Sequence, residues 1–452
     1  MRLHDTAFGR VTDLLDPGQG RVSMYVCGPT VYDVPHVGHG RFALVFDVLR
    51  RYLEWTGLEV RYVSNITDVD DKIIARANRD GRIPEDVARQ YEDVWYDVID
   101  RLGVRRPDAD PHATAYIDHM VELVAELVEK GSAYEAGDGV YFSVESVADY
   151  GLLARQPLES LRSGASGRVH ETGDDKRSPL DFALWKLAKP GEPSWPSPWG
   201  DGRPGWHTEC VVMSLDLLGE GFDLHGGGQD LAFPHHENER AQAVAAGRTF
   251  ARHWAHNGFV EVSGEKMSKS LGNFQTLTDL LAATDPRAYR LLVLQSHYRA
   301  PIEVTRGTLE AAENTLARLD DFARRTAGLD GAVADADTLA TFRRHMDDDL
   351  DTPQAVAHMF ETVRGANQAL GSGDSEEAGR LTAAVREMAG AVGLALAGVE
   401  EAPAEVVQLV EERERARAGR DFAAADRLRD EVFRLGWVVE DTPQGPRVHK
   451  RR

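Results

Sequence analysis

The sequence predicts an α/β fold, in which a parallel sheet is split by an insertion and followed by an all-helical C-terminal region. About the first 75 residues alternate strand and helix, an order typical of a parallel sheet. The strand–loop–helix order returns at residues 222–247 and 257–281. From about residue 277 onward, apolar residues recur almost throughout at helical spacing.

The first unit is a strand, a helix and a second strand. Residues 21–28, RVSMYVCG, are β-branched and aromatic, whereas FALVFDVLRRYLEWTG after Arg41 has helical spacing. Residues 58–67, LEVRYVSNIT, form the second strand, and residues 68–72 close it and begin another helix. Ligands of such sheets bind at the carboxyl ends of the strands, so the turn CGPTVYDVPHVGHGR at 27–41 is the first candidate site.

The middle of the chain differs in composition. Residues 110–135 are predicted to be helical, and residues 136–205 to be short strands and loops rich in Gly, Pro and Ser. This block therefore looks inserted. The later helical region has a break at 371–379 and a linker at 397–405, which leaves a small module at the C-terminus.

Length and composition favour a multidomain globular protein. The chain has 452 residues, of which 42% are hydrophobic and 28% charged. No apolar run of about 18 residues occurs, and MRLHD does not resemble a signal peptide, so we expect a cytoplasmic protein with no membrane partner. The net charge of −22 argues against a general affinity for phosphate backbones, but residues 405–452 carry eleven Lys or Arg against ten Asp or Glu.

The chain has two cysteines, Cys27 and Cys210. A disulfide between them is not expected in a reducing compartment, and two unrelated buried thiols are the simplest alternative. However, PHHENE at 234–239 places His235 and Glu239 four apart, on one face of a helix. Zn²⁺ accepts two thiolates, an imidazole and a carboxylate, so these four residues are candidate ligands that only the fold could bring together.

His36 and His39 lie three apart where the first helix is expected to begin. Their imidazoles project to one side, and the partial positive charge of the helix N-terminus suits phosphate oxygens. Gly38 between them lets a flat group approach the backbone. Capping or surface histidines are the alternative.

Lys266 and Lys269 lie in KMSKS, between Gly264 and Gly272, on a loop that follows a strand. Two lysines three apart on a glycine-flanked loop can fold over an anionic ligand. A solvated polar turn is the alternative.

PHVGH and KMSKS resemble the two signature sequences of class I aminoacyl-tRNA synthetases. Longer segments resemble the cysteinyl-tRNA synthetase family more closely, in the order and at the distances found in that family. They are YVCGPTVYD, NITDVDDKI, DFALWK, KPGEPSW, GRPGWHTEC, HGGGQDLAFPHHENE and GEKMSKSLGN. The resemblance covers almost the whole chain. It implies a Rossmann-type parallel sheet with an inserted connective domain, followed by an all-α C-terminal region.

The resemblance also implies five segments. They are the first half of the catalytic domain (1–115), the connective region (116–205), the second half with the KMSKS loop (206–276), a helical anticodon-binding bundle (277–395) and a small C-terminal module (404–452).

In that family the zinc ligands fall on Cys27, Cys210, His235 and Glu239, with one ion per chain that also accepts the substrate's thiolate. A zinc-bound thiol ionises, whereas a serine hydroxyl stays a weak neutral donor. Discrimination of about ten thousandfold requires roughly 5.5 kcal/mol, more than a hydrophobic pocket gains from a one-atom difference. Such selection explains why no segment resembles an editing domain.

The reaction implied by the resemblance has two steps. ATP, with Mg²⁺, and L-cysteine form cysteinyl-adenylate and pyrophosphate, and a terminal hydroxyl of tRNA(Cys) then accepts the acyl group. His36 and His39 would contact the phosphates, and Lys266 and Lys269 the departing pyrophosphate. Residues at family positions that line the substrate pockets are Gly28, Thr30, Gly38, Thr67, Trp206, Gly227 and Asp230. For Thr67 and Trp206, ordinary packing is the alternative.

The end of the chain departs from the family pattern. Family members commonly finish G-T-x-W before basic residues, whereas this chain has GPRVH at 445–449. The missing tryptophan leaves open one stacking contact with an anticodon base.

Two rival functions were considered. A paralogue that joins activated cysteine to an amino sugar, as the mycothiol-pathway ligase does, lacks the full C-terminal region. An inactive RNA-binding relative would not need both signature sequences and all four ligand positions. We therefore predict an active, monomeric member of the synthetase family that binds tRNA.

Overall fold

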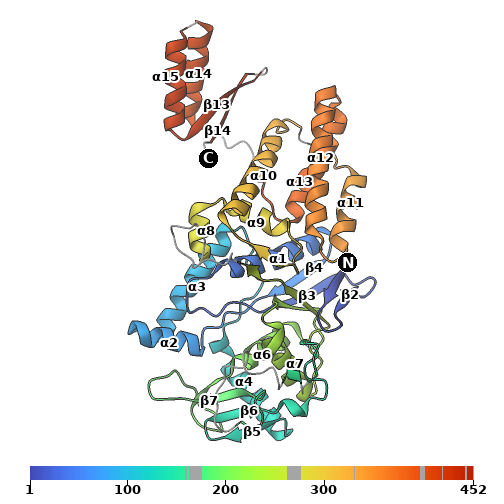
Figure 1. Cartoon of the computed structure of the whole chain (residues 1–452), viewed down its shortest axis with the longest axis vertical. Coiled ribbons are helices and arrows are strands. Elements are labelled where there is room, and N and C mark those ends of the chain that lie inside the picture. Colours follow the sequence, from blue (N-terminus) through green and yellow to red (C-terminus); the bar gives the residue numbers. More distant parts are fainter. Residues whose placement is uncertain are drawn as a thin grey trace.

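The computed structural model describes residues 1–157, 160–161, 176–261, 276–329, 331–397, 403–419, 421–442 and 445–450. Figure 1 shows the central sheet in the middle of the molecule, the inserted region below it and the C-terminal helices above it. The predicted residues Lys266 and Lys269 lie outside the described residues, and so do residues 398–402 of the predicted linker.

The central sheet confirms the predicted parallel arrangement. Its four strands lie in the order β10-β9-β3-β4, and every neighbouring pair is parallel. Their bounds are β3 (Arg21–Val26), β4 (Glu59–Val63), β9 (Leu224–Gly228) and β10 (His253–Asn257). The crossover helix α1 (Val37–Trp55) begins ahead of the predicted start at Arg41, because Gly38 and Gly40 obscure the helical pattern of its first turn.

Alternation along β3 decides which side chains face which core. Val22, Met24 and Val26 lie in the hydrophobic core that contains α1, whereas Tyr25 and Cys27 lie in the other core. The first predicted thiol therefore lies on the face of the sheet opposite to α1.

The second half of the sheet supplies the helices on that opposite face. α6 (Trp206–Leu218) precedes β9, and a π-helical turn (Ala232–His236) leads into α7 (Glu237–Ala245). Figure 1 shows α6 and α7 on the side of the sheet away from α1. Cys210 and Glu239 lie on these helices, on the same side as Cys27.

The predicted helix over residues 110–135 is wrong at both ends. The chain forms a 3₁₀ turn (Ala113–Tyr116) and α4 (Ile117–Glu129), after which Gly131, with a φ of 73°, turns the chain into a strand. That strand opens the four-stranded antiparallel sheet of the insertion, in the order β5-β6-β7-β8. The bounds are β5 (Ala133–Ala136), β6 (Gly139–Phe142), β7 (Phe182–Leu187) and β8 (Gly202–Pro204).

The helical C-terminal region is confirmed, except at its end. Its helices are α8 (Leu277–Ala283), α9 (Pro286–Leu294), α10 (Arg306–Arg325), α11 (Ala336–Asp347), α12 (Thr352–Ser372), α13 (Ser375–Ala391), α14 (Ala404–Ala418) and α15 (Phe422–Arg434). The last described residues instead form an antiparallel hairpin, β13 (Trp437–Thr442) and β14 (Gly445–Lys450). The prediction of an all-α end was wrong. Trp437 and Val439 are two residues apart, as on one face of a strand, and both pack in a small core with Val406 and Val432.

The remaining elements lie at the N-terminus, after β4 and beside the bundle. They comprise the N-terminal hairpin of β1 (Arg2–Asp5) and β2 (Arg10–Asp13), α2 (Asp71–Asp80), α3 (Pro84–Arg101), and the parallel pair β11 (Val260–Glu261) and β12 (Ile302–Glu303). Within the part of the chain that the structure describes, no helix is both long enough and apolar enough to cross a membrane.

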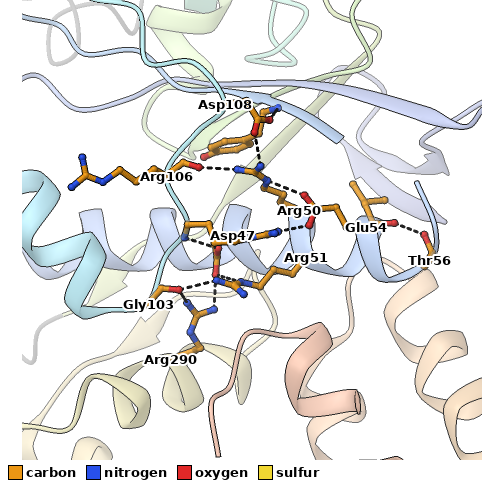
Figure 2. A network of polar contacts seen from close by, with 12 residues as sticks. Asp47, Arg50, Arg51, Glu54, Thr56, Gly103, Arg106, Asp108 and Arg290 are labelled. Atoms are coloured by element: carbon orange, nitrogen blue, oxygen red, sulfur yellow. Dashed lines mark hydrogen bonds and ion pairs between the residues drawn. The ribbon is translucent and has the colours of Figure 1, made fainter. Parts of the chain in front are cut away.

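Asp47, Arg51 and Arg290, here called the arginine network, join α1 to α9 (Figure 2). The guanidinium of Arg290 donates to Asp47 Oδ2 at 2.6 Å and to the Val392 carbonyl at 3.2 Å. Its second nitrogen donates to the carbonyls of Leu102 and Gly103 at 3.2 and 3.0 Å. This network ties the helix that carries His36 and His39 at its start to the turn after α13.

Candidate active site

A cavity of about 770 Å³ opens at the carboxyl ends of β3, β9 and β10. The predicted residues that line it are Cys27, Gly28, Thr30, His36, Gly38, His39, Trp206 and Asp230. Val260 and Thr276 also line it, and they lie on either side of the segment that contains Lys266 and Lys269. The cavity occupies the edge of the sheet at which the sequence placed a ligand site.

The structure brings the four candidate metal ligands together beside this cavity. Cys27, Cys210, His235 and Glu239, here called the thiol cluster, each offer one ligand atom, and these atoms all lie within 4.8 Å of one another. Cys27 Sγ lies 3.6 Å from Cys210 Sγ and 3.5 Å from Glu239 Oε1. His235 Nε2 lies 3.0 Å from Glu239 Oε1 and 3.8 Å from Cys210 Sγ. All four side chains are buried.

Neighbouring rings orient His235 in the thiol cluster. The Trp206 ring stacks on it, with centroids 3.9 Å apart and planes 14° apart. His207 Nδ1 lies 2.8 Å from His235 Nδ1, so Nε2 faces the cluster. Holding a ligand imidazole through its other nitrogen is a common feature of metal sites.

Burial and mutual contacts shift the titration of the thiol cluster. Burial raises the pKa of Cys27 well above its usual value, and the neighbouring Cys210 and Glu239 raise it further. Burial alone would raise the pKa of Cys210, but the hydrogen bond from Cys27 and the contact with His235 lower it to about 6. Burial alone would lower the pKa of His235, but the Glu239 carboxylate raises it to about 10. The cluster therefore already favours one thiolate and one carboxylate.

His225 and His236 were not predicted as site residues. Cys27, His225, His236 and Glu239 form a second group whose ligand atoms lie within 4.8 Å of one another. His225 Nε2 lies 2.7 Å from Glu239 Oε2, and His236 Nδ1 lies 2.8 Å from His256 Nε2. A histidine inside the apolar strand LHGGG was the sequence signal for His225, because a buried imidazole requires a polar partner.

His36 and His39 lie together at the start of α1. His36 is the N-cap residue, and its backbone N–H donates to His39 Nδ1 at 3.1 Å, so a neutral His39 ring carries its proton on Nε2. Burial lowers the pKa of His39 to about 3, and the neighbouring His36 and Lys72 add to this effect. Near neutral pH the His39 ring is therefore a neutral hydrogen-bond donor, and the positive potential here comes from the helix N-terminus.

Of the predicted pocket residues, Gly28 and Gly227 allow close packing where a side chain would collide, and Thr67 makes a buried hydrogen bond. A Cβ on Gly28 would lie 1.7 Å from the Asn65 carbonyl oxygen, so glycine is required at this close approach. The Thr67 hydroxyl donates to Glu209 Oε2 at 2.9 Å and is buried, which agrees with the packing alternative. Gly227 leaves space for the His236 ring, which would lie 2.9 Å from a Cβ there.

Three family descriptions match consecutive parts of the chain. They are "tRNA synthetases class I (C) catalytic domain" over residues 15–314, "DALR domain" over 341–397 and "Cysteinyl-tRNA ligase anticodon binding domain" over 400–448. Curated cysteine–tRNA ligases match at full length. The protein of Caldicellulosiruptor saccharolyticus is 44% identical and that of Halorhodospira halophila 45% identical, each over 100% of both chains.

Solved structures of class I synthetases share the fold. A Mycobacterium tuberculosis methionyl-tRNA synthetase in complex with methionyl-adenylate has a TM-score of 0.60 at 18% identity, over 83% of this chain and 90% of that chain. An Agrobacterium radiobacter LeuRS in a ternary complex with tRNA has a TM-score of 0.63 at 12% identity, over 84% and 85% of the two chains.

Proposed function

The chain belongs to the cysteinyl-tRNA ligase family, and from this premise we propose how its residues divide the work of joining L-cysteine to tRNA(Cys). The alternative of an amino-sugar ligase lacks support, because the matches extend through the anticodon-binding region at 400–448. The proposal concerns three tasks: selecting cysteine, activating it with ATP and holding tRNA.

The thiol cluster is proposed to hold one zinc ion. Four ligands at 2.0 to 2.3 Å from a tetrahedral ion lie roughly 3.3 to 3.8 Å from one another. Three of the four separations described within the thiol cluster, 3.5, 3.6 and 3.8 Å, fall in that range, and the fourth, from His235 Nε2 to Glu239 Oε1, is shorter at 3.0 Å. This agreement is the observation that carries the proposal. A zinc ion held there supplies a Lewis acid that prefers the thiolate of cysteine to the hydroxyl of serine.

His235 and His225 both contact Glu239, and we propose different roles for them. His235 is a ligand, whereas His225 orients Glu239 through the 2.7 Å contact with its second carboxylate oxygen. Trp206 fixes the plane of the His235 ring and forms part of the cavity wall next to the bound cysteine.

Activation is proposed to occur across the start of α1. His39 Nε2–H and backbone N–H groups of the first helical turn donate to phosphate oxygens, and His36 lies beside them. Lys266 and Lys269 neutralise the departing pyrophosphate, with Mg²⁺ bound to ATP. Gly38 lines the cavity, and a Cβ there would lie 2.9 Å from the His36 ring, so glycine is proposed to keep that ring in place beside the nucleotide.

The helical bundle and the C-terminal module are proposed to hold tRNA, through phosphate contacts and splayed anticodon bases. We propose that the protein acts as a monomer. A reducing compartment such as the cytoplasm suits this site, because two sulfurs 3.6 Å apart are candidates for oxidation elsewhere.

Metal analysis of matched variants tests the ligand set. Cys210→Ser changes only the thiol cluster, whereas His236→Asn changes only the second group, because the two groups share Cys27 and Glu239. We expect the wild-type protein and His236→Asn to carry about one zinc per chain. Cys210→Ser should lose tightly held zinc and the preference for cysteine over serine in ATP–pyrophosphate exchange. The reverse pattern, with zinc lost from His236→Asn and kept by Cys210→Ser, would assign the ion to the second group.

A further inference from the structure

Arg41 carries a buried positive charge beside the active-site cavity, and no proposed step so far uses it. It lies on α1, two residues after His39, and is only 1% exposed. Its Nη1 donates to the carbonyls of Gly258 and Phe259 at 2.8 and 2.6 Å. Its Nη2 donates to three more carbonyls, those of His297, Tyr298 and Ala300. One guanidinium therefore holds two segments that are far apart in the sequence.

The first of these segments forms part of the cavity wall. Gly258, Phe259 and Val260 line the cavity together with His36 and Gly38 at the start of α1. Val260 begins β11, which pairs in parallel with β12, directly after the second segment. The guanidinium therefore lies behind the wall that faces the proposed nucleotide site, one hydrogen bond away from residues that line it.

The charge of Arg41 is not matched by a carboxylate. All five of its acceptors are neutral backbone carbonyls, and no ion pair joins it to any of the residues that the structure describes. Arg290 differs, because it pairs with the Asp47 carboxylate. Burial lowers the pKa of Arg41 to about 10, so the guanidinium stays protonated near neutral pH. A charge buried in a medium of low dielectric is weakly screened, so its field extends into the cavity.

The side chains of the cavity do not supply such a charge themselves. Among the described residues that line it, Lys72 and Asp230 are charged, and their signs are opposite. Burial lowers the pKa of both His36 and His39, which leaves the two rings neutral near neutral pH. The charge behind the wall and the partial charge of the helix N-terminus therefore determine which ligands the described part of the cavity attracts. Both favour a polyanion such as the triphosphate of ATP.

We propose that Arg41 is a positioning residue for ATP, and that its buried charge draws the triphosphate to the start of α1; this inference rests on the proposed function. The hydrogen bonds hold the wall in place, and the charge acts through the wall on the ligand. A purely structural role, in which Arg41 only ties β11 to β12, is the alternative. The two roles differ in one respect, because only the first depends on how many negative charges the ligand carries.

The charge on Arg41 and the charge on the ligand should therefore be coupled. Arg41→Gln keeps an amide group that donates to carbonyls and removes the positive charge. Titration calorimetry compares ATP with a sulfamoyl analogue of cysteinyl-adenylate, which lacks the β- and γ-phosphates. We expect ATP to bind Arg41→Gln about tenfold more weakly and the analogue less than about twofold more weakly. In ATP–pyrophosphate exchange, the KM for ATP should rise while the KM for cysteine stays unchanged. Equal loss of affinity for both ligands would overturn the proposal.

Two further variants keep the outcomes distinct. Arg41→Lys retains the charge with fewer hydrogen-bond donors, and it should bind ATP within about twofold of the wild-type affinity. An affinity about tenfold weaker in Arg41→Lys would overturn the proposal even if Arg41→Gln did not fold. Arg50→Gln is the matched control on the same helix, because Glu54 and Asp108 pair with Arg50 at 3.1 and 2.7 Å. It should also bind ATP within about twofold of the wild-type affinity.

The proposed function is tested separately from the role of Arg41. Absence of cysteine-dependent ATP–pyrophosphate exchange from the wild-type protein would contradict the proposed function itself. Normal exchange in the wild-type protein, together with an unchanged ATP affinity in Arg41→Gln, would overturn only the role of Arg41.

Discussion

Two buried polar clusters flank the same sheet, and they differ in how their charges are matched. In the arginine network, Arg290 meets one carboxylate and three backbone carbonyls, so its donors are used within the protein. Burial alone would raise the pKa of Asp47, but Arg290 and Arg51 outweigh burial and hold it below its usual value. The network is complete without any ligand.

The thiol cluster is as deeply buried but contains three acidic groups and a single imidazole. Burial raises the pKa of Cys27 well above its usual value, and the neighbouring Cys210 and Glu239 raise it further. The comparison shows that burial of polar side chains does not by itself indicate a ligand site. The balance of charge indicates a ligand site, because it predicts a bound cation in the thiol cluster and none in the arginine network.

The largest expected effect is on stability in Arg290→Met. Removing one partner of a buried ion pair typically costs about 3 to 5 kcal/mol, and here Arg51 and the backbone N–H of Arg105 would remain beside Asp47. Urea denaturation measures this loss, and metal analysis of the same protein should still find about one zinc per chain. Arg306→Met is the matched control, because the Arg306 side chain is 77% exposed and should change stability by less than about 0.5 kcal/mol. Loss of zinc along with stability in Arg290→Met would show that the two clusters are not independent.

The same contrast explains what the sequence could predict. Two cysteines in 452 residues, each beside a motif, pointed to the thiol cluster before the fold was known. The arginine network gave no such signal, because arginine is common and Arg290 binds a carboxylate 243 positions away together with the carbonyls of Leu102, Gly103 and Val392. Backbone carbonyls leave no trace in a sequence, so such contacts appear only in the folded chain.

Some elements of the fold could likewise be predicted from the sequence, and others could not. The repeated strand–helix pattern was enough to predict the parallel sheet. The hairpin of β13 and β14 was missed, because its alternating pattern is short and packs only on a small core.

The next largest effect is expected on catalysis, from a residue in neither cluster. Lys269→Ala should slow cysteinyl-adenylate formation by two to three decades, because losing one preorganised contact to developing charge costs about 3 to 4 kcal/mol. Pre-steady-state kinetics measures this rate, and cysteine affinity, zinc content and unfolding free energy should change little. An unaltered rate would end the proposed role of Lys269, whereas a loss of zinc would place its effect in the thiol cluster.

The smallest expected effect on cysteine activation comes from deleting everything after Ala397. Such a protein keeps the Val392 carbonyl that Arg290 binds and the hydrogen bond from Ala397 N–H to Asp320, so the arginine network stays complete. ATP–pyrophosphate exchange should therefore remain within a few-fold of the full-length value. A protein ending at Ala391 loses the Val392 carbonyl, the buried side chains of Val392 and Leu394 and the hydrogen bond to Asp320. It should be less stable by at least about 1 to 3 kcal/mol, the cost of the unpaired Arg290 donor alone.

Charging of tRNA should respond in the opposite way, because residues 404–452 carry candidate phosphate and base contacts and no proposed catalytic group. Full-length protein should charge tRNA well and bind it with the steeper salt dependence, since more phosphate contacts release more counterions. The deletion ending at Ala397 should charge poorly, although the absence of the terminal tryptophan makes the loss milder than in relatives that have it. If the shortened protein charges tRNA as efficiently as the intact one at every salt concentration, the C-terminal module does not bind the anticodon region. The sequence change at 446–448 would then mark a different role for that module, while the catalytic half and both buried clusters would stand as described.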